Sequence, residues 1–301
     1  MLEPTQVHSE GPTFSRLVAG VMTWGKWGAK LNATDMARLL EQLVERGITT
    51  IDHADIYGDF TTEEDFGKAL AIVPHLKEKI QLVSKCGIQF PAPGFDHPHK
   101  AYQYDAPYII QQAERSLKVM GVDTLELLLL HRPSPLLDPD AVAEAFARLR
   151  SAGKVQAFGV SNFTPQQFAT VNSRFPLVTN QVEASMLHLA PFTDGTLDQA
   201  LELRCKPMAW SPLGGGKLFS ETVPAERRAL KEAVAQLAEE KGVGLDVLMI
   251  AWLLQHPAGI LPVLGSTKLS RWENYLQATD VSLSHYEWLH LWMAATGTEL
   301  P

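Results

Sequence analysis

The chain contains little cysteine, no long apolar run and no excess of positive charge. Its 301 residues include two cysteines, Cys86 and Cys205, which are too few for a disulfide framework. No apolar stretch approaches the roughly 20 residues that cross a bilayer as a helix. The formal net charge of -8 disfavours a nucleic-acid coat or an anionic membrane surface as a partner. We therefore expect no nucleic-acid partner and no membrane partner.

The amino-terminal residues also lack a targeting signal. Residues 1–16 contain no basic region followed by an apolar run, so they do not resemble a secretory signal peptide. With 46% hydrophobic and 20% charged residues, the composition is ordinary for a globular protein. A cytoplasmic location is the simplest interpretation. Because no linker-like or low-complexity stretch divides the chain, one large α/β domain is favoured over two smaller ones.

Strand-like runs recur along the whole sequence. Each is short, apolar and bounded by polar or turn-forming residues, as expected for buried strands. The runs are Arg16–Ala19, Thr49–Asp52, Ile80–Lys85, Leu125–His131, Gln156–Ser161, Val178–Val182, Pro207–Trp210 and Ile260–Leu264.

Amphipathic segments separate these runs. In Thr34–Arg46, Thr34 is a candidate helix cap, and apolar residues recur at helical spacing on one face. Glycines stand where several of these helices would end. The other segments are Thr62–Ile72, Tyr108–Met120, Pro139–Ala152, Pro165–Val171, Leu197–Leu203, Pro224–Lys241 and Ser270–Ala278, and the glycines are Gly47, Gly121, Gly153 and Gly242.

Eight alternations of strand and helix predict a parallel sheet covered by helices. Eight such units in about 300 residues fit a closed (β/α)8 TIM barrel in a single domain. An open doubly wound sheet is the alternative. The G-x-G-x-x-G fingerprint of its dinucleotide-binding form does not occur in this sequence, which weakens that alternative.

Polar residues follow every one of the eight predicted strands. The carboxyl ends of barrel strands all face one mouth, where the active sites of barrel enzymes lie. The sequence therefore predicts one site assembled from eight strand ends. The residues are Thr23–Trp24, Asp52–Tyr57, Lys85, His131, Ser161–Asn162, Gln181, Trp210–Ser211 and Gly265–Lys268.

Four of these residues together form a candidate proton-delivery group: Asp52, Tyr57, Lys85 and His131. A free tyrosine has a pKa of about 10, and a nearby lysine cation lowers it by stabilising the phenolate. A carboxylate would hold the lysine, and the imidazole would bind the oxygen that receives the proton. Lys85 has an alternative role as a Schiff-base nucleophile. Taken singly, each residue has an ordinary structural interpretation.

No metal site is predicted. His97 and His99 have no evident third ligand, and Asp52, Asp55 and Asp59 are better explained by other roles than as a metal cluster.

The chain resembles the aldo-keto reductase family over nearly its whole length. The resemblance is closest to bacterial reductases of about 300 residues. The motifs that carry it are TIDHADIYG, VSKCG, LLLHRP, GKVQAFGVSNF, TNQVE, AWSPLGGG and PVLGSTK.

This resemblance implies the NADPH-dependent reduction of aldehydes or ketones to alcohols in a (β/α)8 barrel. Tyr57 would be the general acid, with its pKa depressed by Lys85, which Asp52 would hold. His131 would orient the substrate carbonyl. Trp24, Tyr57 and His131 would line the substrate pocket. The carboxyl-terminal segment, about residues 280–301, would also contribute to the pocket.

The resemblance also implies a set of cofactor contacts. Ser161, Asn162 and Gln181 would hold the nicotinamide carboxamide, and Trp210 would stack on the ring. Residues after the seventh strand would close over the pyrophosphate, and those opening the last helix would bind the adenosine 2′-phosphate. The full predicted set is Met22, Thr23, Asp52, Ser161, Asn162, Gln181, Trp210, Ser211, Leu213, Gly214, Gly215, Gly216, Lys217, Gly265, Ser266, Thr267, Lys268, Arg271 and Asn274.

Two other functions remain open from the sequence. Potassium-channel β subunits share the fold and cofactor of this family and serve partly as redox-linked partners, so a binding role would leave the same motifs. A lyase would use Lys85 as a Schiff base. The long aromatic and proline-rich stretch from Phe90 to Tyr104 is interpreted as a wall of the substrate pocket. A monomer is expected, with a small-molecule carbonyl substrate as its binding partner.

Overall fold

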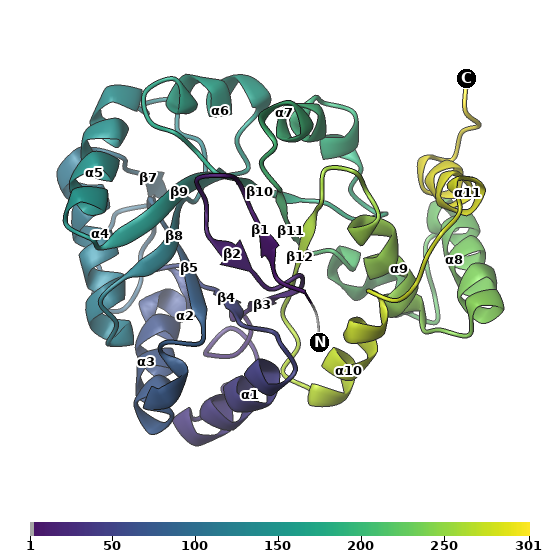
Figure 1. Ribbon diagram of the computed structural model, residues 1–301, viewed down its shortest axis with the longest axis horizontal. Helices are drawn as coiled ribbons and strands as arrows, with labels where there is room; N and C mark the ends of the chain where they lie inside the picture. Colours follow the sequence, from purple (N-terminus) through teal and green to yellow (C-terminus); the bar gives the residue numbers. More distant parts are fainter. Residues whose placement is uncertain (1–2) are drawn as a thin grey trace.

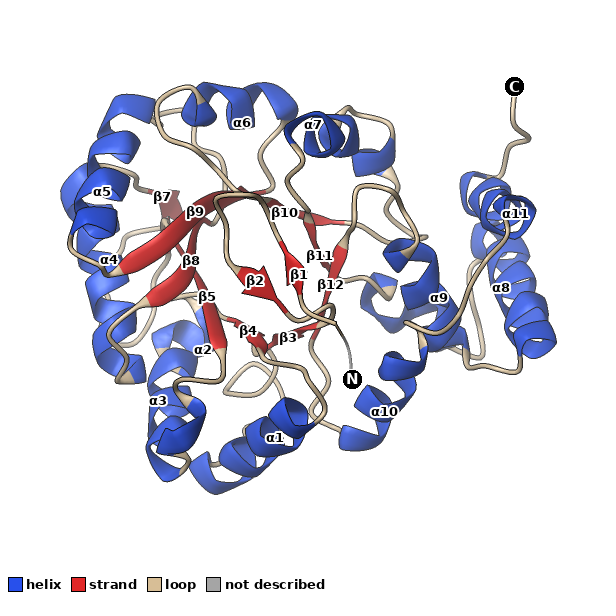
Figure 2. Ribbon diagram, in the orientation of Figure 1, coloured by secondary structure: helices blue, strands red, loops and turns tan. Residues whose placement is uncertain are grey.

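The structure, a computed structural model, describes residues 3–301 and has a closed barrel of eight parallel strands at its centre (Figures 1 and 2). Neighbouring strands pair in register around the ring, and β9 pairs with β10 to close it. The prediction of a (β/α)8 barrel is confirmed. The strands are β3 (Val18–Gly20), β4 (Thr50–Asp52), β5 (Gln81–Cys86), β8 (Leu125–Leu130), β9 (Val155–Ser161), β10 (Asn180–Glu183), β11 (Met208–Trp210) and β12 (Leu261–Leu264).

A ring of helices surrounds these strands (Figure 2). The first begins at a cap in which Asn32 accepts a hydrogen bond from the Asp35 amide at 2.9 Å, so the cap is Asn32 and not Thr34. Its buried face carries Met36, Leu39, Leu40 and Leu43, as the apolar spacing predicts. The ring helices are α1 (Ala33–Glu45), α3 (Thr62–Ile72), α4 (Ala106–Met120), α5 (Pro139–Ser151), α6 (Pro165–Asn172), α7 (Thr196–Leu203), α9 (Leu245–Leu254) and α10 (Leu269–Gln277).

Shorter elements complete the loops between strands. One of them, the turn that carries Tyr57, follows β4 directly. These elements are α2 (Tyr57–Phe60), β6 (Ile88–Gln89), β7 (Ala101–Tyr102) and the 3₁₀ turns Pro74–Leu76, Ala190–Phe192, Gly214–Phe219 and Ala225–Arg227.

An amino-terminal hairpin closes the end of the barrel opposite the strand carboxyl ends. Its strands, β1 (Thr5–Gln6) and β2 (Thr13–Phe14), pair antiparallel and lie across the barrel (Figure 1). Val7 and Phe14 are fully buried and belong to the same apolar cluster as the barrel-lining side chains. The Lys206 amide donates to the Val7 carbonyl at 2.8 Å. The barrel interior is therefore a plugged core with one accessible mouth.

One helix assignment from the sequence is wrong. Pro224–Lys241 was expected to be the barrel helix after the seventh strand, but that helix is α9. The helix α8 (Arg228–Lys241) instead packs with α11 (His285–Thr296) outside the ring (Figure 1). Every residue of α9 from Val247 to Leu253 is buried, because the barrel lies on one side and α8 and α10 on others. A helix buried all round has no amphipathic period to reveal it.

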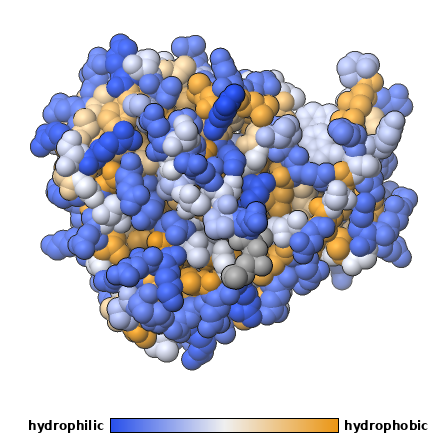
Figure 3. Space-filling view, in the orientation of Figure 1, coloured by the Kyte–Doolittle hydropathy of each residue, from blue (hydrophilic) through white to orange (hydrophobic). Residues whose placement is uncertain are grey.

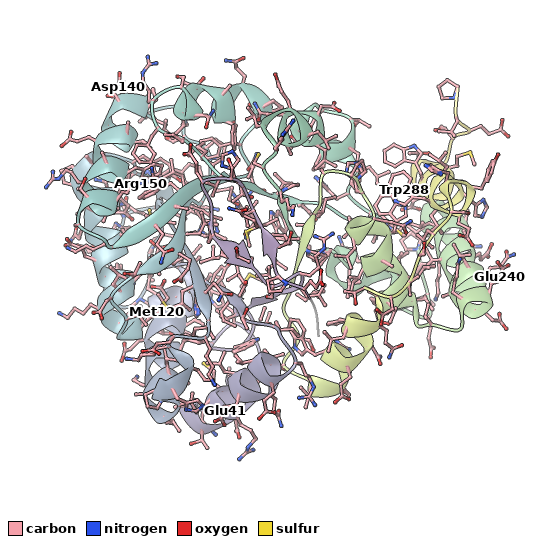
Figure 4. The ribbon with its side chains drawn as sticks, viewed as in Figure 1. Glu41, Met120, Asp140, Arg150, Glu240 and Trp288 are labelled. Atoms are coloured by element: carbon pink, nitrogen blue, oxygen red, sulfur yellow. The ribbon has the colours of Figure 1, made fainter. Side chains whose placement is uncertain are left out.

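The carboxyl-terminal helix is fixed to the barrel by a tryptophan pair. The indoles of Trp252 in α9 and Trp288 in α11 stack at 4.6 Å between centroids. Each indole nitrogen donates to the backbone carbonyl of the other residue, at 3.2 and 3.0 Å. Figure 4 shows Trp288 on the side of the molecule away from Met120 and Arg150. A contribution of residues 280–301 to a substrate pocket stays a prediction.

The face that carries the hairpin is largely hydrophilic with scattered apolar side chains (Figure 3). Among residues 3–301, no helix combines the length and apolarity needed to cross a membrane.

The hairpin plug gives a stability prediction. Phe14→Ala removes a fully buried ring from the closed end of the barrel, so we expect a loss of about 3–5 kcal/mol in the free energy of unfolding. Thr13→Ala, at an exposed position of the same strand, is expected to change it by less than about 0.5 kcal/mol. Urea unfolding followed by circular dichroism measures both. Equal, small effects would show that the hairpin is not part of the cooperative core.

Candidate active site

Lys85, at the mouth end of β5, is the centre of the candidate site. Its side chain is 1% exposed. The ammonium nitrogen lies 2.9 and 2.8 Å from the two carboxylate oxygens of Asp52, 2.7 Å from the His53 carbonyl and 3.1 Å from the Tyr57 hydroxyl. Burial acts to lower the pKa of Lys85, but Asp52 and Tyr57 outweigh it, and the net shift is upward. The lysine is therefore a charged, fully coordinated ammonium.

Asp52 has a second partner that comes from across the barrel. The side-chain amide of Gln181, from β10, donates to Asp52 Oδ1 at 2.8 Å. Both residues are only 2% exposed. Because the amide nitrogen of Gln181 is used here, its oxygen is the end left to accept a hydrogen bond. A role for Gln181 in holding a carboxamide stays a prediction, with its orientation now set by Asp52.

Tyr57 lies directly after β4 in a turn with unusual backbone angles. Gly58, Asp59 and Phe60 all have positive φ, at 62°, 56° and 67°. Such angles are strained for the two residues that are not glycine. The turn directs the Tyr57 hydroxyl inward to Lys85, while the residue as a whole remains 9% exposed.

The sequence predicted a depressed pKa for Tyr57, and the protein alone does not produce one. Burial raises the pKa of the Tyr57 hydroxyl above its ordinary value, whereas the positive charge of Lys85 and its hydrogen bond lower it. The net shift is upward, because removing a phenolate from water outweighs the nearby cation. Tyr57 is therefore a protonated phenol at neutral pH, with an ammonium positioned to stabilise the phenolate left by proton loss.

His131 follows β8 and faces Tyr57. The two ring centroids are 6.1 Å apart in an edge-on arrangement. Burial and the positive charges of Lys85 and Arg132 hold the pKa of His131 well below its usual range, so the ring is neutral. Its Nδ1 atom is enclosed without a partner among the described residues. Nε2 is not enclosed in this way and is the ring atom available to a substrate oxygen.

Trp24 does not line the mouth as predicted. Its side chain is 0% exposed and lies in the apolar core. The indole beside the candidate acid is that of Trp27, whose centroid is 6.1 Å from that of Tyr57 and 6.4 Å from that of Phe90. Asp59 accepts the Trp27 indole hydrogen bond at 2.9 Å and also binds Lys26 at 2.7 Å. No sequence pattern predicts the position of Trp27, because it depends on the turn that brings Asp59 within hydrogen-bonding distance of the indole.

Three of the predicted nicotinamide contacts form one hydrogen-bonded group. The Asn162 side chain donates to Ser161 Oγ at 2.7 Å and accepts from the Trp210 indole at 2.9 Å. Asn162 also has a positive φ of 63°. Trp210 thus keeps a polar contact in addition to its ring face. Asn162 and Trp210 are half-buried, whereas Ser161 is buried.

The predicted phosphate-binding segments lie at the same end of the barrel. Gly214, Gly215 and Gly216 all have positive φ, and a Cβ on Gly214 would come within 2.5 Å of Leu187. Lys268 precedes α10 without a side-chain cap for the helix. Thr23 donates to the Gly265 carbonyl at 2.8 Å, which ties the first loop to the last. The remaining predicted contacts, Met22, Ser211, Leu213, Lys217, Ser266, Thr267, Arg271 and Asn274, are half-buried or exposed.

The stretch from Phe90 to Tyr104 is more ordered than its composition suggests. It includes β7, which pairs with β6 immediately before the stretch, and Phe90 and Phe95 stack on Phe60 at 5.1 and 4.0 Å. The buried Tyr104 hydroxyl donates to the Arg132 carbonyl at 2.6 Å and accepts from the Arg132 amide at 3.0 Å. No sequence pattern predicts these two hydrogen bonds to the backbone of Arg132, the residue after His131.

A polar cluster supports the site from behind the sheet. Glu63 is 1% exposed and accepts hydrogen bonds from Ser84 at 2.6 Å and Ser116 at 2.9 Å. Ser84 immediately precedes Lys85. Among the described residues, no group of three or more metal-ligand side chains could hold a metal ion.

A closed parallel barrel with a carboxylate, a phenol, an ammonium and an imidazole at its mouth defines a barrel enzyme that transfers protons to or from a substrate oxygen. The lyase interpretation, in which Lys85 is a Schiff-base nucleophile, does not agree with this geometry, because a Schiff base needs a neutral, accessible amine. Lys85 is enclosed, charged and bound to oxygen atoms on every side.

Comparison with known proteins identifies the class. The family model described as the aldo/keto reductase family matches residues 16–291, so the chain belongs to this family. It is 42% identical over 304 residues to oxidoreductase YdhF of Escherichia coli, which covers 100% of both chains. It is 41% identical over 289 residues to a 6-dehydroglucose reductase of Agrobacterium fabrum, covering 95% of this chain and 96% of that one.

A solved structure supports the same assignment. A thermostable aldo-keto reductase, determined with the inhibitor epalrestat, matches with a TM-score of 0.81 and 25% identity, covering 97% of this chain and 99% of that one. The protein is an oxidoreductase that acts on carbonyl or alcohol groups.

His53 gives a prediction about acid stability. Its ring packs edge-on against Phe66 at 4.4 Å, and neither ring nitrogen has a partner among the described residues. Burial and the Lys85 charge lower the pKa of His53 to about 3. The unfolded chain therefore binds a proton that the folded chain rejects, and stability falls as pH drops from about 6.5 towards 3. Between pH 7 and pH 5 the loss from this residue is about 2 kcal/mol.

We expect His53→Leu to reduce this pH-dependent loss, as measured by urea unfolding at the two pH values. The control is His290→Leu, at an exposed position, which should follow the wild type. A wild-type slope in His53→Leu would mean that His53 is protonated in the folded state.

Proposed function

We propose that this protein reduces aldehydes or ketones to alcohols, with NADPH as hydride donor and Tyr57 as proton donor. The observation that carries the proposal is the 3.1 Å contact between Lys85 and the Tyr57 hydroxyl, made by an ammonium that Asp52 holds from the other side. When Tyr57 gives up its proton, the resulting phenolate meets a fixed cation already in place, which offsets part of the cost of forming that charge in a buried site.

Tyr57 and His131 together define where the substrate oxygen binds. A carbonyl oxygen between the Tyr57 hydroxyl and His131 Nε2 would accept hydrogen bonds from both. The neutral state of His131 suits a donor that orients and polarises the carbonyl without competing as an acid. As the carbonyl carbon is reduced, the proton passes from Tyr57 to the developing alkoxide, and Lys85 stabilises the phenolate. Solvent then reprotonates Tyr57.

The residues present fit a nicotinamide cofactor, which would supply hydride when bound. The Ser161–Asn162–Trp210 group offers polar atoms for a carboxamide and an aromatic face for the ring. The glycine-rich turn at residues 214–216 exposes backbone that suits close approach of a pyrophosphate. Met22, Thr23, Asp52 and Gln181 are proposed to complete the nicotinamide end.

NADPH is preferred over NADH because of the start of α10. Lys268 and Arg271 are exposed one turn apart, and neither forms an ion pair within residues 3–301. Asn274 lies one further turn along the same face. An uncapped helix start with two cations that have no carboxylate partner among residues 3–301 suits the 2′-phosphate of the adenosine ribose.

The first test is NADPH oxidation with a reactive aromatic aldehyde such as 4-nitrobenzaldehyde. We expect Tyr57→Phe to lower kcat by at least about 100-fold, since the general acid is removed while the ring is kept. NADPH affinity, measured by quenching of tryptophan fluorescence, should be retained. Turnover that survives in Tyr57→Phe would contradict the role of this hydroxyl. Tight NADPH binding without wild-type turnover would favour a cofactor-sensing function.

The cofactor preference has a separate test. Changing Lys268 and Arg271 together to alanine should weaken NADPH binding by about 100-fold or more, because each of the two charge-assisted contacts to phosphate contributes roughly 1.5–3 kcal/mol. NADH binding should change little. Titration of both nucleotides against wild type and variant gives the two ratios. Equal weakening would place the 2′-phosphate elsewhere.

A further inference from the structure

Arg132, the residue after His131, is a guanidinium at the mouth that the proposed mechanism does not use. It is half-buried. One of its nitrogens, Nη1, donates to the His131 carbonyl at 2.8 Å, and the guanidinium lies 5.7 Å from the centre of the Trp210 ring. It therefore lies between the proposed carbonyl-binding residue and the aromatic platform proposed for the nicotinamide.

The position of Arg132 is fixed by its backbone. Tyr104 holds both the amide and the carbonyl of Arg132 through one hydroxyl, at 3.0 and 2.6 Å. The Tyr104 ring occupies the space beside Gly87, where a Cβ would meet it at 2.1 Å. The arginine thus projects from a rigid support, and a fixed side chain discriminates between ligands better than a mobile one.

The charge of Arg132 has no counter-charge in the protein. Within residues 3–301 no carboxylate lies within ion-pairing distance of it, whereas Arg46, Arg115 and Arg174 each have one. The chain carries 34 acidic and 26 basic residues, so acidic partners are not scarce. The charge acts on the site itself, since it contributes to lowering the pKa of His131.

We propose that Arg132 binds a carboxylate on the substrate, which makes the preferred substrates oxo acids or carboxylated aldehydes. Nε and Nη2 are the nitrogens that remain for a ligand once Nη1 is bound to the His131 carbonyl. A guanidinium edge matches a planar carboxylate with two parallel hydrogen bonds. Arg132 directly follows His131, and its guanidinium lies 5.7 Å from the centre of the Trp210 ring. A carboxylate on a substrate whose carbonyl oxygen contacts Tyr57 and His131 would therefore meet Arg132 on the Trp210 side of the mouth. This inference rests on the proposed carbonyl reduction.

The experiment compares matched substrates that differ only in charge. The probes are 3- and 4-carboxybenzaldehyde and their methyl esters. For wild type we expect higher kcat/KM with the carboxylates, mainly through lower KM. Arg132→Met should lower kcat/KM for the carboxylates by about tenfold or more relative to the esters, the loss of one charge-assisted contact. Arg132→Lys should recover part of the preference.

Lys100→Met is the matched control. Lys100 is an exposed cation in the same part of the mouth, and its charge also lowers the pKa of His131. If general positive charge explained the preference, this variant would behave like Arg132→Met. We expect it to retain the wild-type ratio, and equal losses in the two variants would overturn the proposal.

Other outcomes separate this inference from the proposed function. If the wild-type protein reduced neither the carboxybenzaldehydes nor their methyl esters, the proposed carbonyl reduction itself would be overturned. Turnover of both without a difference between wild type and Arg132→Met would overturn only the carboxylate site. A loss of NADPH affinity in Arg132→Met would show that Arg132 supports cofactor binding together with Trp210, and it would overturn the carboxylate site. Should Arg132→Met fail to fold, stronger competitive inhibition of wild type by benzoate than by benzyl alcohol is the expected result, and equal inhibition would contradict it.

Discussion

The enclosed ammonium of Lys85 is the constraint on which the rest of the site depends. A buried cation is costly unless it is paired and hydrogen-bonded. Here the compensation comes from Asp52, the His53 carbonyl and the Tyr57 hydroxyl, which reach Lys85 only because β4 and β5 pair in register. Gln181 fixes Asp52 from the opposite wall of the barrel. Because Lys85 needs Asp52, which a strand across the barrel holds, the position of the Tyr57 hydroxyl depends on the closure of the barrel.

The same buried environment also determines the protonation states of Tyr57 and His131. Burial keeps Tyr57 protonated and His131 neutral, so at neutral pH the site contains one available proton beside one fixed cation. Lowering the pKa of the free phenol is not required for this. The important feature is that the negative charge formed on the Tyr57 oxygen lies beside the Lys85 ammonium, which is already in place and needs no rearrangement. The upward shift of Tyr57 is thus compatible with a proton donor.

The barrel and the four residues of the candidate proton-delivery group could be predicted because their sequence signals are local. Each strand is a short apolar run, and Asp52, Lys85 and His131 stand at strand ends where the chain changes from apolar to polar. Features that depend on tertiary surroundings could not. The helix Leu245–Leu254 is buried all round and has no period. Trp24 and Trp27 are three residues apart, and only the packing shows that the first is in the core and the second beside Tyr57. The hydrogen bond from Gln181 to Asp52 joins residues 129 apart in the sequence.

The turn after Tyr57 connects the proposed acid to two loops at the mouth of the barrel. Holding Asp59 and Phe60 at positive φ costs of order 1–3 kcal/mol each, and that strain serves two contacts. Asp59 binds Trp27 and Lys26 of the first loop, while Phe60 stacks on Phe90 and Phe95 of the third. Both loops are thereby held in a fixed position relative to the proposed acid. Tyr104 does the same for Arg132 on the far side. The strained turn is therefore the link through which a change in either loop reaches Tyr57, and the first loop also contacts the Tyr57 ring directly through Trp27.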